Sequence, residues 1–480
     1  MNVLLVTGRL AEEQVRMQAG DADVADVYVA DVDVAAFITP SHIRHLRLEK
    51  YDLVIVPGLT KGARWRELEE EKGVKIRLGP THAYDIPTVL RHLDSIELRH
   101  DVPADKLIAR QKLKETMELV DGIESYDFMI GSVKVGRGSR MKVVAEVVDA
   151  TRLSEDELRS KISHYLESGA DIIDIGVPME FEVSEVRRAV KIAADMHDAV
   201  SVDTFSKKAI RAGVEAGADM VMSISAENLD ALDAVKGKAV VIVSRDINQL
   251  LTIAEKAERY TDRIILDAVL DAFPGITSSI LRYAELARRS ERPVLFGVGN
   301  VTELSDADSI GMNALLAFMA EELGASLLFT TEASPKTFGS VKELKIASYM
   351  AKAAKLRRTP PKDLGMNLLV VKEKVRFEVC DEFEGCLEGE ESKRFVRDPS
   401  GDFRIWVRNG EIICSHEKLC VKGRTAKAIY DTVIARGLVS RLEHAAYLGR
   451  ELMKAEIAAK LNKNYIQDEP LGFGIYDGER

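Results

Sequence analysis

Eight apolar runs of strand length recur between residues 143 and 330, and stretches with helical periodicity separate them. They lie at 143–149, 171–176, 199–203, 219–224, 240–244, 262–267, 293–298 and 325–330. Their near-continuous Val, Ile and Leu content indicates strands buried on both faces, as in an all-parallel sheet. Eight strand–helix repeats over roughly 215 residues predict a closed (β/α)₈ TIM barrel at 141–355. A doubly wound open sheet is the alternative, and the regular repetition favours closure.

The first segment, residues 1–130, alternates short apolar runs with polar, helix-like stretches. The runs lie at 2–7, 24–29 and 52–57. This alternation predicts a small α/β domain with a parallel sheet. Glycine-bearing turns follow at 57–62 and 79–83, and such glycines are more typical of turn chemistry than of a phosphate site.

The third segment begins after Pro360-Pro361, because paired prolines cannot continue a helix. Residues 362–480 are expected to form a C-terminal α+β domain. Its strands are expected at 367–379, 403–407 and 411–415, and a helical pattern covers 425–462. Asn409-Gly410 is typical of a tight hairpin turn between two of these strands.

Charge and hydropathy exclude several classes of protein. The 480 residues include 67 basic and 78 acidic side chains, and the net charge of −11 repels nucleic acid and anionic membranes. No run approaches the roughly 18 apolar residues of a membrane-spanning helix. The opening Met-Asn-Val-Leu-Leu-Val-Thr-Gly has the pattern of a first strand rather than of a signal peptide. We therefore expect a cytoplasmic protein.

The four cysteines all lie late in the chain, at Cys380, Cys386, Cys414 and Cys420. Four are too few for a disulfide scaffold, so reduced thiols are expected. Paired zinc ligands are usually two to four residues apart, and the Cys-x₅-Cys spacing fits that pattern poorly. Buried, reduced cysteines are the preferred interpretation, and no protein metal site is assigned.

Polar residues stand where the barrel strands are expected to end, which is where the active sites of such barrels lie. They are Asp149, Asp174, Asp203, Ser223, Arg245, Asp267, Asn300 and Glu332. Carboxylates that converge on one opening repel each other unless they meet hydrogen-bond donors or a cation. Helix capping is the alternative for any single residue in this set. A fitting ligand is a flat heterocycle with adjacent N–H donors, such as the 2-amino-4-oxo edge of a pterin.

Two stretches resemble dihydropteroate synthases. The run Glu167-Ser-Gly-Ala-Asp-Ile-Ile-Asp-Ile-Gly176 resembles their second-strand motif. Ser201-Val-Asp-Thr-Phe-Ser206 and Glu215-Ala-Gly-Ala-Asp219 resemble their third strand and the approach to the fourth. The resemblance covers about residues 143–340. With its outer segments, the chain is similar to an archaeal group described as dihydropteroate synthase-related, which implies a pterin-binding barrel.

The resemblance implies roles for individual residues. Asp203 and Asp267 match aspartates that hold the pterin ring, and Asp174 matches a polar position near it. Asp149 lies near an asparagine that contacts metal and diphosphate in that family. Ser223 replaces an asparagine that contacts the ring, Ser244-Arg245 replaces a Met-His pair, and Gly299-Asn300 replaces a lysine-bearing turn.

A second resemblance involves Asn300. Gly297-Val-Gly-Asn-Val-Thr-Glu303 and Gly311-Met-Asn-Ala-Leu-Leu316 resemble pterin-dependent methyltransferases that serve a corrinoid protein. The resemblance implies that Asn300 contacts the N5 side of a methylated tetrahydropterin. A role in capping the following helix is the alternative.

These resemblances imply a transferase that uses a reduced pterin. The first interpretation is condensation of a dihydropterin-CH₂-diphosphate with an arylamine, in folate or tetrahydromethanopterin synthesis. Asp203, Asp267 and Asn300 are expected to seat the ring, and Mg²⁺ or a helix N-terminus would help diphosphate to leave. Arg245 and Lys336 would bind the diphosphate or an anionic co-substrate, unless Glu332 pairs with one of them.

Two other functions stay open. One is methyl transfer from a methyl-tetrahydropterin to a corrinoid protein or a thiol, which needs protonation of N5 or a hydrogen bond to it and no metal. The other is a non-catalytic pterin carrier or regulator. A homodimer is the expected assembly.

Overall fold

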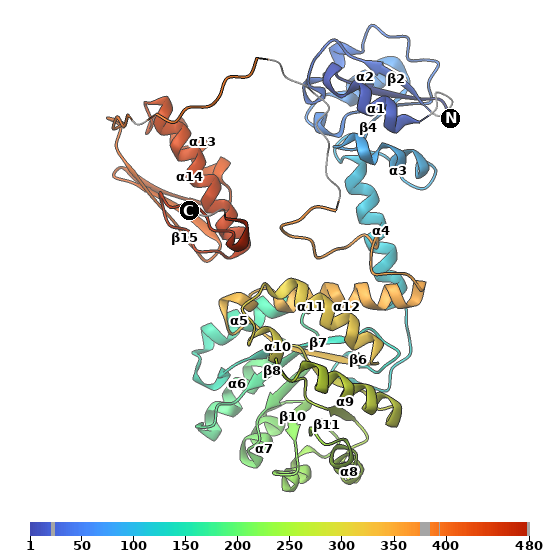
Figure 1. Ribbon diagram of the computed structural model, residues 1–480, viewed down its shortest axis with the longest axis vertical. Coiled ribbons are helices and arrows are strands. Elements are labelled where there is room, and N and C mark those ends of the chain that lie inside the picture. The colour runs from blue at the N-terminus through green and yellow to red at the C-terminus, as the bar shows by residue number, and fades with distance from the viewer. Residues whose placement is uncertain (21–24, 375–384, 393, 478–480) are drawn as a thin grey trace. The chain divides into compact units, whose positions relative to one another are not determined.

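The computed structural model describes residues 1–20, 25–374, 385–392 and 394–477 (Figure 1). The chain forms two compact units, Met1–Asp381 and Glu382–Arg480. The first unit contains a four-stranded and an eight-stranded sheet, and the second contains a three-stranded sheet. Of the helices in the described ranges, none has the length and apolar content to cross a bilayer.

The first sheet is entirely parallel, with the order β2-β1-β3-β4. Its strands are β1 (Val3–Thr7), β2 (Asp26–Val29), β3 (Leu53–Val56) and β4 (Lys75–Leu78). The helices around it are α1 (Glu12–Ala19), α2 (Trp65–Lys72), α3 (Ile86–Arg91) and α4 (Ala104–Asp121). Leu4 and Val6 pack with Trp65 on one face, and Val3 packs with Val15 on the other. The small parallel α/β sheet agrees with the sequence interpretation.

The sequence does not predict β4. Ile76 and Leu78 are fully buried, but Lys75 is exposed and Arg77 is only partly covered. A strand at the edge of a sheet keeps charged side chains on its open side. The run therefore lacks the continuous apolar character that marks the other strands.

The central sheet closes into the predicted barrel. Its strands are β7 (Lys142–Val147), β8 (Ile172–Gly176), β9 (Val200–Asp203), β10 (Met220–Ile224), β11 (Ala239–Val243), β12 (Ile264–Asp267), β13 (Leu295–Gly297) and β14 (Leu327–Thr331). They are parallel, in the order β12-β11-β10-β9-β8-β7-β14-β13. A parallel bridge between Leu266 and Val294 joins the two ends. The open-sheet alternative is therefore excluded.

Helices surround this barrel (Figure 1). They are α5 (Glu155–Ser168), α6 (Val183–Met196), α7 (Lys207–Ala216), α8 (Ile247–Ala257), α9 (Ile276–Arg289), α10 (Gly299–Thr302), α11 (Ser309–Glu322) and α12 (Ser340–Arg357). The chain after β10 forms a 3₁₀ segment, Leu229–Val235, in place of an α-helix. The α5 N-terminus carries a capping box in which Ser154 and Glu157 satisfy each other's backbone amides.

A β-hairpin closes the N-terminal end of the barrel. Its antiparallel strands are β5 (Phe128–Ile130) and β6 (Val133–Val135). Ile130 and Val135 are fully buried and pack with residues that begin barrel strands, among them Ile172, Met220 and Ala239. Protein side chains therefore fill this end.

The second unit is an antiparallel sheet packed against two helices. Its elements are β15 (Phe403–Arg408), β16 (Glu411–His416), β17 (Leu419–Gly423), α13 (Ala426–Ala435) and α14 (Leu442–Leu461). Ile405 and Ile412 pack with Ile429 and Leu452. Asn409 and Gly410 form the hairpin turn with positive φ angles of 51° and 71°, as predicted.

The strand expected at 367–379 is wrong where the structure describes it, and 375–379 lie outside the described residues. Residues 367–374 are irregular and pair with no strand of the described residues, and Leu369, Val370 and Val371 are each at least half exposed. Of the cysteines, Cys414 is buried whereas Cys386 and Cys420 are exposed. Cys380 lies outside the described residues.

We expect the stability of the barrel to depend on Asp171, which directly precedes β8 and is largely shielded from solvent. Its carboxylate accepts hydrogen bonds from Arg140 Nη2 at 2.7 Å and Lys345 Nζ at 2.8 Å. Asp171→Asn leaves Arg140 without its counter-charge, which typically costs about 3–5 kcal/mol. Calorimetry should show a lower transition temperature. The exposed Asp195→Asn variant is the control, and an equal effect of both variants would contradict the expectation.

Candidate active site

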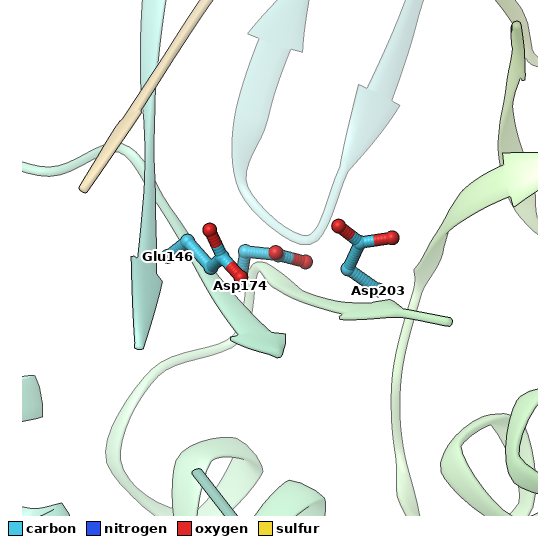
Figure 2. A group of neighbouring side chains, drawn as sticks. All are labelled: Glu146, Asp174 and Asp203. Atoms are coloured by element: carbon cyan, nitrogen blue, oxygen red, sulfur yellow. The ribbon is translucent and has the colours of Figure 1, made fainter. Parts of the chain in front are cut away.

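Three carboxylates from adjacent strands meet inside the barrel mouth (Figure 2). Glu146 on β7 pairs in register with Asp174 on β8, and Asp174 pairs with Ser201 on β9. Asp203 lies two residues beyond Ser201, so it points to the same interior face. One carboxylate oxygen from each of Glu146, Asp174 and Asp203 lies within 4.8 Å of the other two. We call these three residues the acidic cluster.

Asp174 is the most deeply buried member of the acidic cluster. Its side chain is fully buried, and Oδ1 accepts a hydrogen bond from Ser201 Oγ. Oδ2 has no hydrogen-bond partner among the described residues. Burial, followed by repulsion from Asp203 and Glu146, raises the pKa of Asp174 well above its usual value.

The other two members hold protons near neutral pH. Burial and the charges of Asp203 and Asp149 raise the pKa of Glu146 to about 7. Burial and the charge of Asp267 raise the pKa of Asp203 to about 7. Because the charged groups that raise these pKa values are carboxylates, the mouth is electrostatically unsatisfied when all are ionised.

Glu146 is the functional candidate that the sequence interpretation missed. It lies inside β7 rather than at its end, between apolar residues of the run 143–149. The signal that points to it is a charged residue within a strand that is otherwise buried. Gly176 gives it space, because a Cβ at Gly176 would lie 2.5 Å from Glu146 Oε1.

Asp267 ends β12 and is held rigidly at the mouth. Its Oδ1 accepts hydrogen bonds from the Tyr283 hydroxyl and from the Val269 backbone amide, both at 2.7 Å. Val269 adopts φ of 62°, a conformation rare for a β-branched residue, beside the carboxylate that it contacts. Burial raises the pKa of Asp267 despite these donors.

Three more of the predicted residues lie near the strand ends: Asp149 after β7, Ser223 within β10 and Asn300 on α10. Asp149 follows β7 with φ of 51° and pairs with Arg152 at 3.0 Å. The Ser223 carbonyl accepts a hydrogen bond from Asn228 Nδ2 at 3.0 Å. Asn300 is exposed on α10, and its Nδ2 donates to the Leu270 carbonyl at 2.9 Å. Val298, not Asn300, is the N-cap residue of α10, so the capping alternative is wrong.

The remaining three predicted residues are engaged with other partners. Arg245 Nη2 pairs with Asp271 at 2.7 Å, and Lys336 Nζ pairs with Asp306 at 3.0 Å. Glu332 pairs with neither cation. Its carboxylate is almost fully buried, lies 2.8 Å from His164 Nε2 and accepts a hydrogen bond from the Val341 amide.

The structure thus gathers Asp174, Asp203 and Glu146 at one mouth, with the charge of Asp267 close enough to act on Asp203. It leaves Arg245, Lys336 and Glu332 in ion pairs outside that cluster. Such a mouth can accept several N–H hydrogen bonds from a flat, guanidine-like ring, or it can hold a cation.

Two family models and a long relative match this chain. A model of the family "Pterin binding enzyme" matches residues 146–280, which include Glu146, Asp174, Asp203 and Asp267. A second family model, PterinBD-DUF4346, matches residues 397–468 of the second unit. An uncharacterized protein of Methanocaldococcus jannaschii is 38% identical over 98% of this chain and 98% of its own.

Solved dihydropteroate synthases share the barrel at low identity. The Yersinia pestis enzyme with a pterine-sulfa conjugate is 19% identical, covers 48% of this chain and 100% of its own, and gives a TM-score of 0.39. The Xanthomonas albilineans enzyme in complex with 7,8-dihydropteroate is 21% identical, covers 45% and 93%, and gives 0.37.

The pterin-binding family model covers the strands that bring the acidic cluster together, and the Methanocaldococcus jannaschii protein is a relative over nearly the whole chain. The chain belongs to the dihydropteroate synthase-related family of pterin-binding proteins.

Proposed function

We propose that Asp203 and Asp267 clasp a reduced pterin at the barrel mouth, and that the protein is a dihydropteroate synthase-like transferase. The observation that carries the proposal is the convergence on one mouth of one buried and several partly buried carboxylates. The 2-amino-4-oxo edge of a pterin supplies adjacent N–H donors that such carboxylates accept. Asp267 is preorganised for this task by Tyr283 and the Val269 amide.

The reaction we assign is condensation with an arylamine in synthesis of a folate-type carrier, such as tetrahydromethanopterin. The arylamine nitrogen forms a bond to the pterin methylene carbon while the carbon–oxygen bond to diphosphate breaks, and the nitrogen then loses a proton. Arg245 and Lys336 are the proposed ligands of the anionic groups. Each must first exchange its present carboxylate partner, Asp271 or Asp306. A homodimer is part of the proposal, and light scattering tests it.

Replacing either clasping carboxylate by its amide should weaken pterin binding. Asp203→Asn and Asp267→Asn each remove a charge-assisted hydrogen bond while they keep side-chain size, so we expect Kd to rise at least about tenfold. Calorimetric titration with a panel of reduced pterins measures the effect. The exposed Asp195→Asn variant serves as the control, and wild-type affinity in both mouth variants would overturn the proposed clasp.

Pterin affinity should also fall as the pH drops. The pKa of Asp203 is about 7 in the free protein, and N–H donors stabilise only its ionised form, so binding requires loss of a proton below that pH. We expect Kd to rise about tenfold between pH 8 and pH 6. Titrations in buffers with different ionisation enthalpies should reveal proton release. The Asp203→Asn variant should lack this dependence, and a flat profile in the wild type would contradict it.

Methyl transfer is the second candidate, because apolar side chains surround the mouth. Loops that follow β8, β9, β12, β13 and β14 each expose a large apolar residue by half or more of its surface: Met179, Phe205, Phe273, Leu304 and Phe338. Such exposure on several loops of one face is typical of a surface that binds another protein. A corrinoid protein that accepts a methyl group from a bound methyl-tetrahydropterin would contact this face, with Asn300 near N5.

Variants of these loops separate the two candidates. If a corrinoid protein docks there, Phe205→Ser and Phe273→Ser should slow methyl transfer to it about tenfold while the Kd for pterin stays unchanged. Assays with a methyl-tetrahydropterin and a corrinoid acceptor measure transfer, and assays with a dihydropterin-CH₂-diphosphate and an arylamine measure diphosphate release. Pterin binding without turnover in either assay would select a non-catalytic carrier or regulator.

A further inference from the structure

We propose that one face of the three-stranded sheet in the second unit binds an acidic segment from a second copy of this chain. We call this face the outer face; it consists of Arg404, Trp406, Arg408, Ile413 and Lys422. The acidic segment is residues 386–391, Cys386-Leu-Glu-Gly-Glu-Glu391. Both parts lie in the second unit, so the inference does not depend on pterin chemistry in the barrel.

Strand alternation separates the outer face from the helices of the unit. Ile405 and Ile412 belong to the core that the sheet shares with α13 and α14 (Figure 1). Because successive side chains of a strand point to opposite faces, Arg404, Trp406 and Arg408 point away from that core. The two arginines are exposed, and Trp406 keeps 40% of its surface in contact with solvent.

Strand register gives the outer face an apolar centre with cations around it. Trp406 on β15 pairs with Ile413 on β16, and Ile413 pairs with Lys422 on β17. Arg404 and Arg408 stand two residues before and two residues after Trp406 on the same strand. An exposed indole between two guanidinium groups has the composition of the residues that contribute most to protein interfaces.

The charges of the outer face call for an acidic partner. Within the described ranges, neither Arg404 nor Arg408 forms an ion pair, whereas Arg397 and Arg441 of the same unit pair with Asp402 and Glu443. Residues 394–477 contain 14 basic and 11 acidic side chains, in a chain whose net charge is −11. This region is therefore basic, and the rest of any second copy is acidic.

The acidic segment matches the outer face in charge and in apolar content. It has no regular secondary structure, and Leu387 is 95% exposed. Among the described residues, Glu388, Glu390 and Glu391 have no cationic partner. All residues from 385 to 392 are exposed, so the segment leaves the outer face of its own copy uncovered. A second copy is the occupant that supplies the missing carboxylates together with an apolar side chain.

Exchange of segments between two copies forms a closed pair. Each copy donates one segment and accepts one, so a twofold axis relates two identical contacts and leaves neither part unused. Exposed ion pairs are individually weak, but the second contact forms within an assembled pair and therefore benefits from a high effective concentration. The packing of Leu387 on Trp406 adds apolar burial to the ion pairs.

Charge reversal in the full-length protein tests the inference. The face variant carries Arg404→Glu and Arg408→Glu, and the segment variant carries Glu388→Lys, Glu390→Lys and Glu391→Lys. Sedimentation velocity should show a wild-type dimer, and the dimer Kd of each variant alone should rise at least about tenfold because like charges meet. About 1 M NaCl should also weaken the wild-type dimer, since the screening length falls to about 3 Å.

An equal mixture of the two variants gives the decisive measurement. In the mixed pair, one contact joins the wild-type segment to the wild-type face, and the other joins the two reversed parts, which attract each other. The mixture should therefore dimerise where each variant alone does not. Trp406→Ser should weaken the wild-type dimer at least about tenfold. The control Arg436→Glu, which reverses an exposed arginine at the end of α13, should leave it unchanged.

Three results would overturn the inference: a monomeric wild type, a dimer that both variants retain, or a mixture of folded variants that stays monomeric. Circular dichroism verifies the fold of each variant, and the altered charges are all exposed. If the wild type is monomeric, fluorescence anisotropy with oligouridylate shows whether the outer face binds single-stranded nucleic acid instead. Pterin binding by the monomeric variants would leave the proposed function intact, whatever the outcome for the dimer.

Discussion

The repulsion among carboxylates that are wholly or partly buried at the barrel mouth is the interaction on which the proposed function of this protein depends. Parallel strands that end at one edge place their terminal side chains within a few ångströms of each other. Here Asp174 is fully buried and Glu146 and Asp203 are partly buried, so the free protein must keep protons or take up a positive partner. The carboxylates of the mouth therefore lack hydrogen-bond donors. A ligand that donates hydrogen bonds to them would bind favourably because it lowers their mutual repulsion.

The rest of the barrel tolerates this unfavourable centre. Strands buried on both faces and the helices around them supply a large apolar core. The hairpin plug and the Arg140–Asp171–Lys345 network fix the opposite end. In such barrels the N-terminal end serves stability and the C-terminal end serves function. The paired charges of Arg140, Asp171 and Lys345 lie at the N-terminal end, and the mutually repelling carboxylates of the acidic cluster lie at the C-terminal end, as this division predicts.

The barrel could be predicted from sequence because each of its strands coincides with an apolar run. The site could be predicted only in part. Asp174, Asp203 and Asp267 stand at or near strand ends, where active-site residues of such barrels are expected. Glu146 lies inside its strand, and it joins the cluster because strand register places it beside Asp174. The pairing of Glu332 with His164 joins residues 168 positions apart. Residues 367–374, where a strand was expected, are irregular and pair with no strand of the described residues, so an apolar run alone does not make a strand.

The β5–β6 hairpin at the N-terminal end of the barrel also limits the route by which a ligand can enter and leave. Because Ile130 and Val135 fill the N-terminal end of the barrel, a molecule bound deep in the mouth enters and leaves only through the C-terminal opening. Two reactants that share such an opening must arrive in a fixed order, the deeper one first. Their joined product must leave before the next cycle can begin. The filled N-terminal end of the barrel thereby sets the order of binding and release for any reaction at the opposite end.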